Sequence, residues 1–101
     1  MNPILPTDEE TNLLFDDVIR EMCKNFAYTS AEATNLVRKY YELFNDARYC
    51  DRIGIPKQDD DFFFHEGAGG MALRIHYYLG LKENPDPNKF INWRSSFYKN
   101  K

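Results

Sequence analysis

The stretch DDDFFFHEGAGG, residues 59–70, holds the residue types in this chain that could most readily do chemistry. Its His65-Glu66 pair resembles half of the helical zinc motif of metalloproteases, in which a second histidine follows four positions after the first. Position 69 is a glycine, and the next histidine is His76. The aspartates lack the alternating ligand positions and the terminal glutamate of a calcium loop. The pattern therefore predicts no metal site, and no cofactor is expected.

The glycine cluster at residues 67–70 is flexible enough to cradle a phosphate group. No Lys-Ser or Lys-Thr pair follows it, and no clear strand precedes it, so nucleotide binding is not predicted. Glycines at these positions can instead let two helices, or a helix and a loop, approach closely, or let residues 61–65 fold over the end of a helix. The three phenylalanines before them are then expected to be core residues.

Catalysis by a nucleophile or a general base is not supported by the spacing of the candidate groups. His65 or His76 could act as a base near neutral pH, but no serine, cysteine or carboxylate stands at a spacing typical of a triad. Cys23 and Cys50 lie in apolar surroundings and are interpreted as free core thiols. We expect no enzyme, and keep as an alternative a metal-dependent or small-molecule enzyme centred on His65, Glu66 and His76.

Two capping boxes indicate where the first helices begin. In each, a threonine hydroxyl can accept from a first-turn amide while a glutamate three positions later reaches back, at Thr7 with Glu10 and at Thr29 with Glu32. Apolar residues then recur at helical spacings over residues 14–26 and 33–44. We therefore predict two amphipathic helices, the first with an acidic outer face.

The second half of the chain is also expected to be mainly helical. After residues 45–46, a helical turn could continue to Gly54, and residues 54–61 are predicted to be a loop whose carboxylates can cap the next helix. A helical pattern runs from Met71 to Gly80, and Asn84-Pro85 marks a turn. Asp86-Pro87 is typical of a helix start. The one ambiguity is residues 61–64, which could form a short buried strand.

These patterns predict an all-α fold, a single bundle-like domain of about four or five helices over residues 1–101. The length allows one compact core, and 43% hydrophobic residues with 16% aromatics are enough to form it. No apolar run approaches the length of a membrane span, and no signal peptide is visible, so a cytoplasmic location is expected, away from membranes.

Charge is unevenly distributed along the chain. Residues 1–61 carry 13 acidic and 7 basic side chains, whereas residues 62–101 carry 3 acidic and 6 basic ones, for a net charge of −3. An acidic surface favours association with a basic partner and disfavours direct binding of nucleic acid, whose phosphates carry the same sign.

Tyrosines beside carboxylates are the features that could form a protein interface, because tyrosine offers a large amphipathic area at a small entropic cost. The residues predicted to contact a partner are Asp16, Asp17, Glu42, Asp46, Asp59, Asp60, Asp61, Tyr41 and Tyr49. The interface is expected to combine exposed carboxylates with exposed tyrosines.

The capped acidic N-terminal helix, the tyrosine-rich second helix, the segment FFFHEGAGGMALRIHYYLGL and the tail FINWRSSF together resemble small bacterial immunity proteins of contact-dependent or polymorphic toxin systems. The resemblance is one of size, acidity and general character over the whole chain. It implies a non-catalytic inhibitor that binds a cognate toxin domain, often a basic nuclease, and covers its active site. A helical adaptor subunit that self-associates through an apolar face is the other alternative, and the sequence does not define the oligomeric state.

Overall fold

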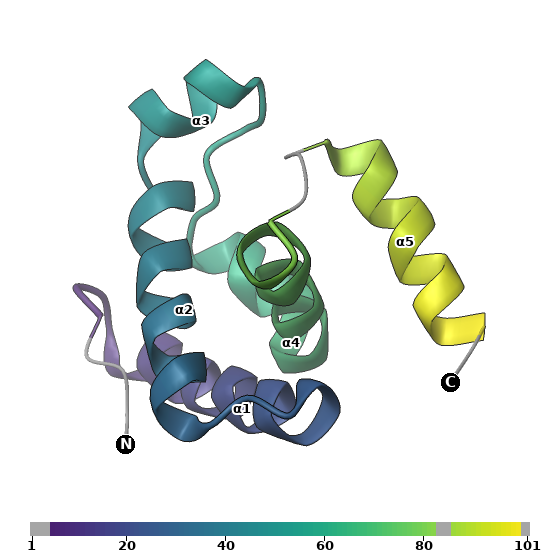
Figure 1. The fold of residues 1–101 in the computed structure, drawn as a ribbon. Coiled ribbons are helices and arrows are strands. Elements are labelled where there is room, and N and C mark those ends of the chain that lie inside the picture. The colour runs from purple at the N-terminus through teal and green to yellow at the C-terminus, as the bar shows by residue number, and fades with distance from the viewer. Residues whose placement is uncertain (1–4, 83–85, 100–101) are drawn as a thin grey trace.

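The computed structural model describes residues 5–82 and 86–99, which form five α-helices (Figure 1). The helices are α1 (Glu9–Phe26), α2 (Ser30–Phe44), α3 (Ala47–Ile53), α4 (Asp60–Ile75) and α5 (Pro87–Lys99), with a π-helical turn, η1 (His76–Gly80), that continues α4. These residues contain no strand, which confirms the all-α prediction and excludes the strand considered for residues 61–64. The turn predicted at Asn84-Pro85 lies outside the described residues.

Local capping fixes most of the helix starts as the sequence indicates. Thr29 and Glu32 form both bonds of a capping box, 3.1 Å from the Thr29 hydroxyl to the Glu32 amide and 2.9 Å from the Glu32 carboxylate to the Thr29 amide. Asp86 accepts from the amide of Asn88 at the start of α5. Gly54 ends α3 with a positive φ of 77°, a backbone conformation that glycine adopts without a steric cost.

The start of α1 differs from the predicted one. Asp8, not Thr7, is the N-cap, and its carboxylate accepts from the Thr11 amide at 2.8 Å. The capping box predicted between Thr7 and Glu10 is therefore wrong by one position, because an aspartate next to a threonine competes equally well for this role. The Thr7 hydroxyl is thereby free to bond elsewhere.

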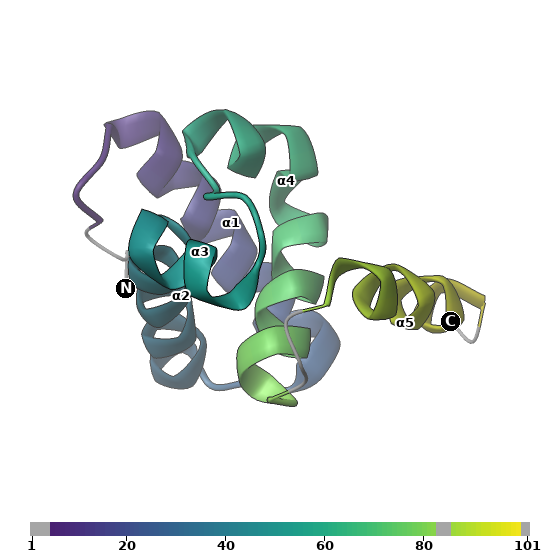
Figure 2. The ribbon, with the colours of Figure 1, turned by 90° about the horizontal axis from the view of Figure 1, so that it is seen from above.

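A sharp kink divides α4 at Gly67, whose φ of 76° and ψ of 174° are not helical. Residues 60–66 and 68–75 thus form two helical pieces that meet at an angle, as the ribbon shows (Figure 2). Gly70 lies opposite the first piece, where a Cβ atom would stand 2.9 Å from the Glu66 carboxylate. Of the three glycines in the cluster, only Gly70 has a close neighbour, the Glu66 carboxylate of the same helix, whereas a Cβ atom at Gly67 or Gly69 would meet nothing within 4 Å.

The core is formed where α1, α2 and α4 pack together, and aromatic rings occupy its centre. Phe63 of α4 lies edge-on to Phe15 of α1, with the ring centroids 5.1 Å apart, and Tyr40 stacks on Phe44 within α2 at 4.2 Å. Of the three consecutive phenylalanines, Phe63 is buried, Phe62 is half-buried and Phe64 is 46% exposed. The expectation that all three are core residues thus holds only in part.

Helix α5 lies on the side of α4 away from α2 and α3 in both views (Figures 1 and 2). Phe90 is its buried residue, and its ring lies 5.4 Å from that of Tyr77 in η1. Trp93 continues the contact at 5.1 Å from Tyr77. Side chains, more than close backbone packing, therefore attach α5 to the rest of the protein.

Candidate functional site

The start of α4 forms one wall of an open acidic pocket of about 360 Å³. Asp59 is the N-cap of α4 and accepts from the Phe62 amide at 2.9 Å, which places the next two aspartates in the first turn. The entry to α1 and the end of α2 supply the opposite wall. We call this the acidic pocket, and its lining residues are Pro6, Thr7, Tyr41, Asn45, Asp59, Asp60 and Asp61.

A short hydrogen bond closes one side of the acidic pocket. The Thr7 hydroxyl donates to Asp60 at 2.5 Å, and this bond ties the segment before α1 to α4. Burial raises the pKa of the Tyr41 phenol, and the nearby charges of Asp60 and Asp8 raise it further, against the hydrogen bond with Thr7. Tyr41 consequently keeps its proton across the neutral range and remains a possible donor in a pocket otherwise dominated by acceptors.

Four of the predicted partner-binding residues come together in the acidic pocket, namely Asp59, Asp60, Asp61 and Tyr41. One expectation about them is wrong: Tyr41 is only 6% exposed, so its ring is part of the core and not an exposed contact surface. It is buried because it faces α1 and α4, where its ring meets Phe15 edge-on and Phe63.

The other predicted residues do not line the acidic pocket. Asp16 and Asp17 lie on α1, where Asp17 pairs with the exposed Arg20. Glu42 is exposed on α2 and Asp46 caps α3. Tyr49 is half-buried, with its ring edge-on to Phe44 at 5.6 Å and the Arg52 guanidinium over it.

Most tyrosines are core residues, contrary to the expectation of an interface rich in exposed tyrosine. Tyr98 is the exposed one, and Tyr28 is half-buried like Tyr49. The buried members are Tyr40, Tyr41, Tyr77 and Tyr78. Several of these are neighbours on a helix, and both members of each pair are buried because neighbouring helices cover two faces of the same turn.

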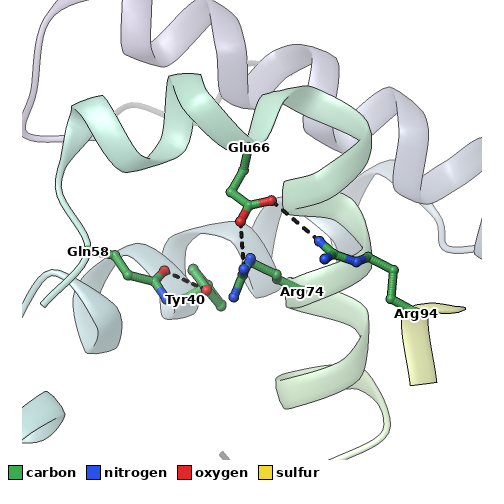
Figure 3. A network of polar contacts seen from close by, with 5 residues as sticks. All are labelled: Tyr40, Gln58, Glu66, Arg74 and Arg94. Carbon is green, nitrogen blue, oxygen red and sulfur yellow. Dashed lines mark hydrogen bonds and ion pairs between the residues drawn. The ribbon is translucent and has the colours of Figure 1, made fainter. Parts of the chain in front are cut away.

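Glu66 belongs to a network of half-buried charged groups (Figure 3). One of its carboxylate oxygens accepts from Arg74 at 2.5 Å, and the other lies 3.8 Å from Arg94 of α5. The Arg74 guanidinium lies over the rings of Phe62 and Phe90, at 4.9 and 4.6 Å from the ring centroids. Glu66 thus links the two pieces of kinked α4 to each other and to the middle of α5.

Beside this network, the fully buried hydroxyl of Tyr40 donates to the side-chain oxygen of Gln58 at 2.6 Å (Figure 3). Burial strongly raises the pKa of Tyr40, against the positive charge of Arg74. Gln58 also bonds through its backbone to Phe44 and Asn45. The loop between α3 and α4 is therefore held against α2 by hydrogen bonds at a single residue.

His65, Glu66 and His76 have separate neighbours. His65 is exposed, Glu66 pairs with two arginines, and the Nδ1 atom of His76 lies 2.6 Å from the Tyr28 hydroxyl. Phe26 stacks on the His76 ring at 3.9 Å, and burial lowers the pKa of His76. Within residues 5–82 and 86–99, no three potential metal ligands of the His, Cys, Asp and Glu types are grouped.

Sequence reasoning missed Thr7 and Asn45 in the acidic pocket, Arg74 and Arg94 in the Glu66 network, and Gln58 beside it. No local signal identifies them, because Thr7 meets Asp60 across 53 positions of the chain. The pairing of Arg74 with Glu66 could not be predicted from the sequence, because the kink at Gly67 brings the two side chains together.

No protein-family model, no curated protein and no solved structure matches the chain. None of the helices in the described ranges has the length and apolar character that crossing a membrane requires.

Proposed function

We propose that this protein is a non-catalytic toxin inhibitor of the immunity-protein kind, located in the bacterial cytoplasm. It binds a basic toxin domain through the acidic pocket. The observation that carries the proposal is the gathering of Asp59, Asp60 and Asp61 around an open depression with no basic residue in its lining. A lysine or arginine of the partner would complete the missing half of this charge arrangement.

The lack of a positively charged partner within the described residues supports an external one. Among the described residues, none of Asp59, Asp60 and Asp61 forms an ion pair within the protein. Three neighbouring carboxylates repel one another, and a cation brought between them relieves that repulsion. Such a surface mainly accelerates association and selects partners by charge, with a smaller effect on the affinity itself.

The test is co-expression with a basic toxin domain, taken from the variable C-terminal end of a large secreted protein if a neighbouring gene encodes one, followed by growth and binding measurements. We expect co-expression to restore growth and the two purified proteins to form a stoichiometric complex. Replacing all three aspartates by asparagine removes the charge but keeps a good N-cap at position 59 and an acceptor for Thr7 at position 60. This variant should associate about tenfold more slowly at low ionic strength and show a weaker salt dependence.

A matched control removes three charges elsewhere. Glu21→Gln, Glu32→Gln and Asp51→Asn change the net charge equally but lie outside the acidic pocket, and glutamine at position 32 can still complete the capping box. Equal slowing of association in both triple variants would show that the effect depends only on net charge. Growth inhibition that the protein does not relieve, or a complex unaffected by either variant, would contradict the proposal.

A further inference from the structure

A second pocket, of about 250 Å³, opens between the loop after α3, both pieces of α4, η1 and the start of α5. Its walls are mainly apolar, formed by Ile55, Pro56, Phe62 and Pro87. This volume lies just below the range of about 300–1,000 Å³ typical of sites for drug-sized ligands. The pocket therefore suits a small ligand with an apolar body.

The polar side chains that line this pocket mainly offer hydrogen-bond donors. Lys57, Gln58, Arg74 and Tyr78 line it, and its lining contains no aspartate or glutamate. Gln58 is more than nine-tenths buried and its side-chain oxygen is already bonded to Tyr40, so its NH2 group is the polar end left for a ligand. Burial raises the pKa of Tyr78, which keeps its hydroxyl protonated. The lining thus offers hydrogen-bond donors.

The charge around this pocket is also unbalanced. Arg74 and Arg94 share the carboxylate of Glu66, and Lys57 adds a further positive charge at the pocket. Asp86 is the other acid near Tyr78, and its carboxylate caps α5. The Nε atom of Arg74 is buried without a hydrogen-bond partner among the described residues. Buried donors and cations are normally satisfied, so this donor excess favours an acceptor with negative charge.

We infer that this donor pocket, lined by Lys57, Gln58, Arg74 and Tyr78 with apolar walls, binds a small organic carboxylate whose apolar body is a ring or a branched chain. The carboxylate lies toward Lys57 and the Gln58 amide, and the apolar body packs between Phe62 and Ile55. Inorganic anions match the donors but leave the apolar walls without a partner. The pocket shares no lining residue with the acidic pocket, so the inference does not depend on the proposed function.

The experiment is a titration of the full-length isotope-labelled protein with benzoate, followed by amide chemical shifts, with benzyl alcohol and inorganic phosphate as reference probes. Saturable shifts from benzoate are expected to concentrate on Ile55, Lys57, Gln58, Arg74 and Tyr78. Benzyl alcohol keeps the ring but lacks the charge, and phosphate keeps the charge but lacks the ring. Both should bind at least about fivefold more weakly, the ratio that corresponds to one modest charged contact.

Lys57→Gln is the variant of choice because Lys57 is exposed and its replacement leaves the Glu66 network intact. It should weaken benzoate binding about fivefold, whereas Lys39→Gln, an exposed lysine on α2 outside the pocket, should leave it unchanged. Unfolding curves for both variants verify that they fold. Absence of saturable shifts, shifts centred elsewhere, equal binding of any reference probe, or equal effects of the two variants would overturn the inference.

Discussion

The carboxylate of Glu66 is the only one paired with Arg74 and Arg94 in the described part of the chain, and its side chain is 14% exposed. Glu66→Gln keeps the shape of the side chain and removes the charge, so that Arg74, whose side chain is also 14% exposed, is left without a counter-charge. Breaking a fully buried ion pair in this way costs about 3–5 kcal/mol, and the partial exposure of this pair places the expected cost at about 3 kcal/mol. We expect a loss of that order in the free energy of unfolding, measured by urea denaturation.

An exposed ion pair provides the matched control. Asp17→Asn removes the carboxylate that pairs with Arg20 on the surface of α1, and the expected loss is below about 0.5 kcal/mol because solvent screens such pairs. Similar losses in the two variants would show that Glu66 is solvated in solution and does not hold α4 and α5 together.

The half-buried ring of His76 should make stability depend on pH. Burial holds the pKa of His76 in the folded protein below its ordinary value of 6.5. Between these two values the unfolded chain binds more protons than the folded one, so the free energy of unfolding falls as the pH drops below about 6.5. A protonated ring can only donate from Nδ1, the atom that lies 2.6 Å from the Tyr28 hydroxyl.

The measurement is urea unfolding at a series of pH values from neutral to mildly acidic. His76→Phe keeps a ring that can stack on Phe26 but cannot be protonated, so its stability should lack the decrease that starts near pH 6.5. Glu32, near Tyr28, has a pKa below its ordinary value and titrates in a more acidic range. The same decrease in both proteins would assign the pH dependence to another group.

At the scale of the helix, the kink in α4 depends on the backbone freedom of one glycine. Gly67 has φ of 76° and ψ of 174°, a region that other residues enter at a cost of about 1–3 kcal/mol. A Cβ atom there would meet nothing within 4 Å, so Gly67→Ala tests backbone strain alone. The expected result is a loss of stability of that size in urea unfolding.

Gly69 is the control within the same helix, because a Cβ atom there is also free of neighbours and its backbone is helical. Gly69→Ala should stabilise the protein by about 0.5–1 kcal/mol, since alanine loses less conformational freedom in a helix. The two substitutions thus have opposite expected signs. Equal effects would mean that α4 has no kink at Gly67 in solution.

Helix starts and ends were predictable where a few adjacent residues decide them. The capping box at Thr29 and the Asp86-Pro87 start are local signals, and the structure confirms both. The kink at Gly67 could not be located in advance, because three glycines in four positions offer the same freedom and tertiary packing selects among them. The start at Asp8 was missed by one position because two capping residues are adjacent.

At the scale of the whole molecule, the clustering of Asp59, Asp60 and Asp61 results from their adjacency, but their place in a pocket does not. That place requires Thr7 and Tyr41, from other parts of the chain, to meet the start of α4. The burial of Tyr41 could not be predicted for the same reason, because the residues that cover it are distant from it in the sequence. The sequence thus predicted the acidic character of the candidate site, whereas its shape depends on the packing of α1 and α2 against α4.

The arrangement of the helices also predicts an uneven distribution of stability. Phe90 is the one buried residue of α5 in the described range, whereas α1 buries Phe15, Val18, Ile19, Met22 and Thr11. Local opening depends on the amount of buried apolar contact, so α5 should detach at a lower free energy than α1 and α4. Native-state hydrogen exchange should show weaker protection of amides in α5 than in those helices.

Substitution at Phe90 separates local detachment of α5 from global unfolding. Phe90→Ala removes the ring that meets Tyr77 and the Arg74 guanidinium, so amide exchange should accelerate more in α5 than in α1. Tyr98→Ala, at a side chain that is 54% exposed on the same helix, should leave the exchange pattern unchanged. If Phe90→Ala accelerated exchange in α1 and α5 by the same factor, α5 would open only together with the core, and the protein would be a single cooperative unit.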